Sequence, residues 1–163
     1  METERVSSAV ASIGRTVLVR LAPGEDLFGG LRAVCERHEL RSGRIATMIG
    51  SLRTASLVCV TPDPANPGRV VYLEPRTVEG PLELIAAQGV FGRDDEKQEL
   101  SIHLHAQVAG EDLRPLAGHL ADTGNNRVLA TAEIVIDVFD GAELRRSFDE
   151  ETGFVLFKIF PKQ

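Results

Sequence analysis

The chain has no tryptophan and a single tyrosine, Tyr72, among 163 residues. Proteins that bind single-stranded nucleic acid stack the bases on exposed aromatic side chains, so this scarcity argues against such a surface. Basic residues are also in deficit, because 18 lysines and arginines face 24 acidic residues, for a net charge of −6 at pH 7. Affinity for duplex DNA comes mainly from clustered lysine and arginine, and the overall charge therefore argues against strong DNA binding.

Cysteine is scarce as well. Cys35 and Cys59 lie in different expected elements with no paired spacing, so we expect two buried free thiols and neither a cysteine zinc site nor a redox motif. The N-terminal segment is acidic and has no apolar run, which predicts no signal peptide, no membrane span and a cytoplasmic location. The Gly29-Gly30 pair lacks the lysine and the spacing of a nucleotide-binding glycine loop.

The remaining composition is that of an ordinary globular domain. Hydrophobic residues make up 43% of the chain and charged residues 26%, with no internal repeat and no break that would divide the chain. A chain of this length buries roughly two thirds of its unfolded surface, so it needs no disulfide bond or structural metal to fold. We therefore expect a loose N-terminal arm over residues 1–14 and a single domain over residues 15–160.

One helix and many strands are expected. The helix is predicted to follow Asp26 as N-cap, with apolar residues Leu27, Leu31, Val34 and Cys35 at helical spacing. Strands are predicted at residues 16–21, 44–49, 55–60, 70–73, 82–91, 100–108, 129–138 and 154–159, with a turn at residues 50–51. This pattern predicts an α+β domain with a mostly antiparallel sheet packed against one main helix.

The segment 99–108 alternates strictly between polar and apolar residues, the pattern of a half-buried strand. His103 and His105 therefore leave the same face, roughly 7 Å apart. A turn centred near Glu111 would bring His119 opposite His103. Three imidazoles could then hold one metal ion with a fourth position open, zinc being favoured and iron, copper or nickel remaining alternatives.

A simpler interpretation is that these histidines only belong to the solvent-exposed face of an amphipathic strand. Pro115 in the returning segment also weakens the predicted hairpin, since proline in a sheet is expected only on an edge strand or at a bulge. The clustering favours a site, because three of the four histidines fall between residues 103 and 119. His38, the fourth, lies in the helical pattern beside charged residues and is expected at the surface.

Several segments, taken in order, resemble one known family, the plant and prokaryote conserved (PPC) domain, in its prokaryotic form without an AT-hook. The resemblance covers residues 15–157. The segments that carry it are Leu21-x-Pro23-Gly24-Glu25-Asp26-Leu27, Ile49-Gly50-Ser51-Leu52, Gly80-Pro81-Leu82-Glu83-Leu84-Ile85, His103-Leu104-His105, Gly118-His119-Leu120 and Ala130-Thr131-Ala132-Glu133-Ile134.

The resemblance implies an α+β fold that assembles as a homotrimer, with a histidine cluster that can hold a metal, here His103, His105 and His119. In plant members a Gly-Arg-Phe-Glu-Ile-Leu motif contacts other nuclear proteins. The corresponding segment 80–85 keeps Gly80 and Glu83 but lacks the arginine and the phenylalanine, and the chain has no AT-hook. Those departures count against plant-type partners and against direct DNA binding.

Three functions follow as hypotheses. The first is a non-catalytic, homotrimeric module that binds zinc for regulation or interaction, with room for a small ligand at the metal. The second is a hydrolase-like metalloenzyme with an open three-histidine site, in which Glu133 orients a ligand histidine or acts as general base, unless it is simply solvent-facing. The third is a transcriptional regulator, supported by the family label and by arginines at 41, 44, 53, 145 and 146; we rank it below metal binding.

Overall fold

The computed structural model describes residues 5–162, which form one helix and ten strands. The helix is α1 (Leu27–Arg37). The strands are β1 (Ser12–Leu21), β2 (Gly43–Val58), β3 (Val60–Pro62), β4 (Val70–Tyr72), β5 (Arg76–Asp94), β6 (Leu100–Ala109), β7 (Pro115–Leu120), β8 (Val128–Asp140), β9 (Ala142–Asp149) and β10 (Phe154–Pro161).

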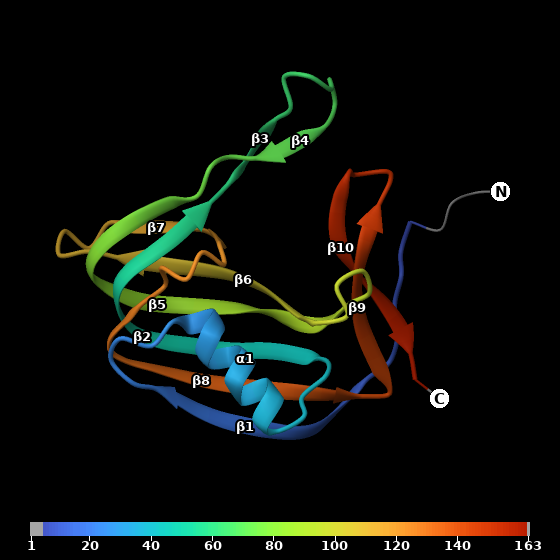
Figure 1. Ribbon diagram of the computed structural model, residues 1–163, viewed down its shortest axis with the longest axis horizontal. Helices are drawn as coiled ribbons and strands as arrows, with labels where there is room; N and C mark the ends of the chain where they lie inside the picture. The colour runs from blue at the N-terminus through green and yellow to red at the C-terminus, as the bar shows by residue number, and fades with distance from the viewer. Residues whose placement is uncertain (1–4, 163) are drawn as a thin grey trace.

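Eight of these strands form one curved sheet in the order β1-β8-β2-β7-β6-β5-β9-β10, with β2 also paired to β5. Strand β7 pairs with β6 and with the end of β2, so β2, β5, β6 and β7 close on themselves. All pairings are antiparallel except the short one between β5 and β9. Helix α1 lies across one face of the sheet (Figure 1). The prediction of an α+β domain with a mostly antiparallel sheet and one main helix is confirmed.

The core lies between α1 and the sheet face that it covers. Every second residue of β6 points into this core, as Ile102, Leu104 and Ala106 are buried. The intervening residues face the other side. The face away from α1, which we call the outer face, therefore carries the polar half of the alternation, including the three histidines.

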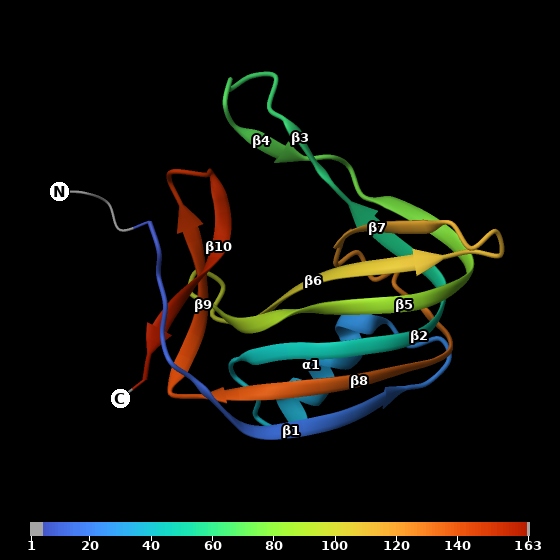
Figure 2. The same cartoon turned by 180° about the vertical axis from the view of Figure 1, so that it is seen from behind.

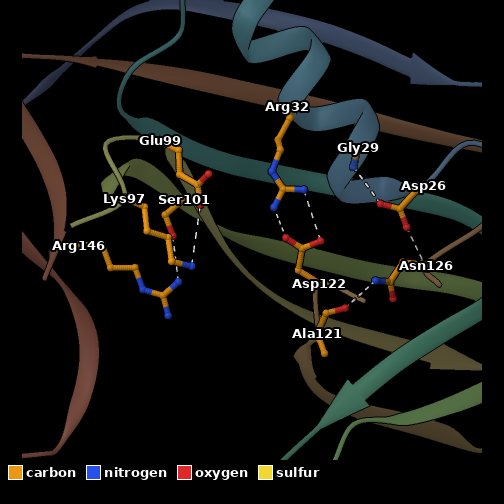
Figure 3. Close-up of polar contacts among 10 residues, drawn as sticks. All are labelled: Asp26, Gly29, Arg32, Lys97, Glu99, Ser101, Ala121, Asp122, Asn126 and Arg146. Atoms are coloured by element: carbon orange, nitrogen blue, oxygen red, sulfur yellow. Dashed lines mark hydrogen bonds and ion pairs between the residues drawn. The ribbon is translucent and has the colours of Figure 1, made fainter. Parts of the chain in front are cut away.

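Helix α1 begins where the sequence predicts. The Asp26 carboxylate accepts a hydrogen bond from the Gly29 N–H at 2.9 Å and a second from the Asn126 N–H at 3.1 Å (Figure 3), so it caps the helix and ties it to the loop before β8. A Cβ atom on Gly30 would lie 2.7 Å from the Leu21 side chain. Glycine at this position lets the helix approach β1 closely.

The predicted turn at residues 50–51 is wrong, because β2 runs unbroken through Gly50. A Cβ atom here would lie 2.1 Å from the Thr131 carbonyl oxygen of β8, and the backbone adopts a φ of 152°. The pairing of β2 with β8 shifts register just after this residue. Gly50 therefore marks a close approach of two strands within a bulge, which sequence reading alone does not separate from a turn.

Other differences concern the ends and edges of the sheet. Strand β1 begins already at Ser12, inside the segment expected to be a loose arm; residues 1–4 of that arm lie outside the described residues. Strand β9 was not predicted, and Cys59 is exposed where a buried thiol was expected, whereas Cys35 is buried.

Among residues 5–162, no helix is both long enough and apolar enough to cross a membrane.

Two hairpins project from the body of the sheet, β3 with β4 and β9 with β10 (Figure 2). They touch each other. The rings of Tyr72 on β4 and Phe154 on β10 meet edge to face with centroids 5.3 Å apart, and Arg69 donates a hydrogen bond to the Glu150 carbonyl oxygen at 3.4 Å. These contacts place both hairpins beside the histidine-bearing strands.

Candidate metal centre

A five-residue connection between β6 and β7 sets the register of the histidines. The Leu113 N–H donates to the Gly110 carbonyl oxygen, and Leu113 has a φ of 59°. Pro115 is the first residue of β7, where a missing N–H is tolerated. The turn is thus centred one residue later than predicted, so His119 pairs directly with His105 and not with His103.

The three imidazoles nevertheless meet at one point on the outer face. One potential ligand atom from each of His103, His105 and His119 lies within 4.8 Å of the others. The Nε2 atoms of His103 and His105 are 3.1 Å apart. The ring centroid of His119 lies 4.9 Å from that of His103 and 5.5 Å from that of His105. The simpler interpretation, in which these residues only form a solvent-exposed strand face, does not account for this clustering.

Side chains from both projecting hairpins surround the imidazoles. The Tyr72 ring packs against His119 with centroids 5.4 Å apart, and Phe154 packs on Tyr72. The Arg146 guanidinium of β9 donates a hydrogen bond to the hydroxyl of Ser101 (Figure 3), which shares the His103 face of β6. Aromatic rings therefore pack on the cluster at His119, and an arginine lies beside the strand that carries His103.

These surroundings favour the neutral forms of His103 and His119. Burial lowers the pKa of His119 to about 4, and the charges of His103, His105 and Arg146 act in the same direction. Burial also lowers the pKa of His103, again reinforced by His105 and Arg146. Because a metal binds the neutral imidazole, the lowered pKa values of His103 and His119 favour the ligating protonation state of these two residues.

The lowered pKa of His119 predicts a pH-dependent stability for the metal-free protein. Between pH 6.5, the ordinary value, and about 4, the unfolded chain binds a proton at His119 that the folded chain does not. The free energy of unfolding should therefore fall as the pH drops through this window. Urea unfolding of chelator-treated protein at several pH values would show this slope, and His119→Gln should flatten it. Identical slopes in both proteins would contradict the assignment.

The geometry fits a small divalent ion. Tetrahedral zinc with Zn–N bonds of 2.0–2.1 Å places its ligand nitrogens about 3.3 Å apart. The 3.1 Å between the Nε2 atoms of His103 and His105 is close to this spacing, and the ligand atom of His119, within 4.8 Å of the other two, needs a shift of at most about 1.5 Å. Moreover, the buried Nδ1 of His119 has no hydrogen-bond partner within residues 5–162, and a metal bound there would satisfy it.

The other residues singled out from the sequence lie elsewhere. Glu133 is exposed on β8, three strands from β6, which is roughly 14 Å across the sheet. The structure therefore does not place Glu133 beside the imidazoles. Glu83 is exposed on β5, opposite Ser51, and Gly80 makes a close approach to the Leu52 carbonyl oxygen of β2.

Sequence reasoning missed the residues that surround the cluster, namely Tyr72, Phe154, Ser101 and Arg146. Their positions depend on how two hairpins fold over the outer face, and no local pattern reports that. Two weak signals existed: Tyr72 is the single tyrosine, and Arg146 belongs to an arginine pair.

Comparison with known proteins agrees with this fold. Among solved structures, a metal-containing protein from Archaeoglobus fulgidus superposes with a TM-score of 0.78, at 23% identity, over 94% of this chain and 99% of that one. A PPC protein from Pyrococcus horikoshii gives 0.72 at 23% identity over 94% and 97%. A candidate DNA-binding protein from Bacteroides thetaiotaomicron gives 0.73 at 20% identity over 90% and 94%.

A curated relative is the bifunctional protein GlmU of a Synechococcus strain, 31% identical over 147 residues. The match takes in 89% of this chain but only 20% of that protein, so the chain spans about a fifth of its relative. The model of the Plants and Prokaryotes Conserved domain matches residues 8–140, most of the chain and all three histidines. This chain therefore belongs to the Plants and Prokaryotes Conserved domain family, the family that its sequence resembles.

Proposed function

We propose that the chain is a non-catalytic regulatory or interaction module that binds one zinc ion through His103, His105 and His119. The observation that supports this most directly is the meeting of three potential ligand atoms within 4.8 Å of one another. Neutral imidazoles are ligands that zinc prefers. A structural relative is described as metal-containing, and its fold covers nearly the whole of this chain.

A zinc ion held by three histidines would supply a Lewis-acid centre with a fourth position for a small ligand. The chain's own residues determine what reaches that position. Tyr72 and Phe154 form an apolar wall beside His119, and Arg146, hydrogen-bonded to Ser101 on the His103 face of β6, contributes a positive charge. The exposed edge of His105 leaves the centre open to solvent.

A metal-dependent hydrolase is the weaker candidate, because general-base catalysis needs a proton acceptor near the metal. Glu133, the carboxylate that the sequence offers for this role, lies roughly 14 Å away across the sheet. Among residues 5–162, the metal-binding group contains histidines only. DNA binding has less support still, because the chain carries a net charge of −6.

The direct test is metal analysis of protein purified without an affinity tag. We expect about one equivalent of zinc per chain, and anomalous scattering from crystals should locate it between the three imidazoles. Protein that stays metal-free after zinc is supplied would refute the proposal.

We infer in addition that the chain forms a homotrimer through its outer sheet face. Apolar side chains are exposed here without a partner: Leu18 is 80% exposed, and Ile49 and Ile85 are each 47% exposed. Ile49 and Ile85 line a shallow hollow together with Glu83 and Glu133. An apolar patch on a sheet face is typical of an interface between subunits, and the family resemblance favours three copies.

Light scattering should give a mass three times 17.7 kDa. The double variant Leu18→Glu, Ile49→Glu should shift the mass to that of a monomer, because six carboxylates would be buried in the trimer interface. Leu113→Glu is the matched control, since Leu113 is 79% exposed in the turn between β6 and β7 and does not belong to this apolar patch. A monomeric wild type, or an unchanged mass in the double variant, would refute the assignment.

A further inference from the structure

Arg146 is a half-buried cation without a carboxylate partner. No acidic side chain of residues 5–162 lies within 4.0 Å of its guanidinium. Its Nε donates to the Val155 carbonyl oxygen at 3.1 Å, and its Nη1 donates to the Ser101 hydroxyl at 2.9 Å (Figure 3). A guanidinium has five N–H groups, so three remain for other acceptors.

The guanidinium is held in place. Its two neutral acceptors come from different strands, β6 and β10, and the ring of Phe157 lies 5.9 Å below its central carbon. The neighbouring Arg145 behaves differently, because it pairs with Glu143 at 2.9 Å and stacks on Phe160. Of the two adjacent arginines on β9, Arg145 therefore has a carboxylate partner and Arg146 has none among residues 5–162.

The Arg146 charge lies beside the histidine-bearing strand. Its hydrogen-bond partner Ser101 precedes His103 by two residues on the same face of β6, so the Cβ atoms of Ser101 and His103 are roughly 7 Å apart.

The charges at this site do not balance. Three neutral imidazoles leave the two positive charges of a divalent ion uncompensated, and Arg146 adds a third. Within the described part of the chain, no carboxylate joins the metal-binding group or pairs with Arg146. Because the centre is open to solvent at His105, an anion from solution can reach these charges and neutralise them.

We propose that the centre binds a small oxyanion, a carboxylate or a phosphate, one oxygen of which reaches the metal while another accepts hydrogen bonds from Arg146. This inference rests on the metal site proposed above. Guanidinium groups match the planar spacing of two oxygens and form charge-assisted hydrogen bonds with them. Arg146 would thus determine which ligands the open position accepts.

The test uses full-length protein loaded with cobalt(II), whose visible absorption reports ligands entering the metal's coordination shell. Inorganic phosphate and acetate are titrated into wild type and into Arg146→Gln, Arg146→Lys and Arg145→Gln. The wild type should bind at least one of the two anions, and Arg146→Gln should bind it about tenfold or more weakly, the loss expected for a charge-assisted hydrogen bond. Arg146→Lys should be intermediate, and Arg145→Gln should match wild type.

Metal content, measured first, separates the two proposals. A wild type that takes up no metal refutes the metal site and this inference with it. Equal anion affinities in metal-loaded wild type and Arg146→Gln overturn the oxyanion site but leave the metal site standing. Equal anion binding to metal-free wild type, measured by calorimetry because that protein has no cobalt absorption, does the same. If Arg146→Gln fails to fold, Arg146→Lys and the comparison of loaded with metal-free wild type decide. Whichever of phosphate and acetate binds the metal-loaded wild type more tightly shows whether the site prefers phosphates or carboxylates.

Discussion

The double variant His103→Ala, His105→Ala should purify with almost no zinc under conditions in which the wild type carries about one equivalent per chain. The Nε2 atoms of these residues lie 3.1 Å apart and would supply two of the three ligands of the proposed site. His119 alone would remain, and a single imidazole does not hold zinc against dilution. Metal analysis after gel filtration measures the loss.

The variant should remain folded, because both side chains leave the outer face of β6 whereas Ile102, Leu104 and Ala106 form its buried face. Adding zinc should raise the melting temperature of the wild type by mass action and leave that of the double variant unchanged. His38→Ala is the matched control, since His38 caps the C-terminal end of α1 outside the cluster. Equal zinc content in the double variant would place the ligands elsewhere.

The histidine cluster could be predicted from sequence because a strand alternates with a period of two. Strict alternation over residues 99–108 fixes His103 and His105 on one face whatever the partner strand does. The partner's register was harder to predict. It depends on how many residues the turn uses, and the left-handed Leu113 moves His119 from opposite His103 to opposite His105. The histidine side chains are long enough to accommodate this shift, so His103, His105 and His119 still meet at one point.

The residues around the cluster could not be predicted in the same way. Tyr72 contacts His119, and Arg146 contacts Ser101 on the same strand as His103, because the β3–β4 and β9–β10 hairpins fold over the outer face. Those contacts join residues far apart in sequence. Gly50 illustrates the same limit. A glycine between two apolar runs is compatible with a turn or with a close strand crossing, and only the position of Thr131 in the neighbouring strand decides.

Replacing Gly89 with alanine should destabilise both the sheet and the metal site. Gly89 on β5 pairs with Leu104 on β6, and a Cβ atom at Gly89 would lie 1.8 Å from the carbonyl oxygen of His103. The obstacle is backbone, which no rotamer change can move aside. Strands β5 and β6 would have to separate at this point, and we expect the free energy of unfolding to fall by about 3 kcal/mol, the upper end for overpacking.

The same displacement carries His103 with it, so zinc affinity should fall although no ligand has been removed. Gly110→Ala is the control, because its Cβ atom would find its nearest neighbour, an Asp112 oxygen, at 4.0 Å in the turn between β6 and β7. That variant should change stability by no more than about 0.5 kcal/mol. Urea unfolding with and without zinc measures both effects. If Gly89→Ala kept wild-type stability, β5 and β6 would not pair this closely beneath the cluster. If the variant lost stability but kept its zinc affinity, the backbone of β6 would not be what positions the His103 ring.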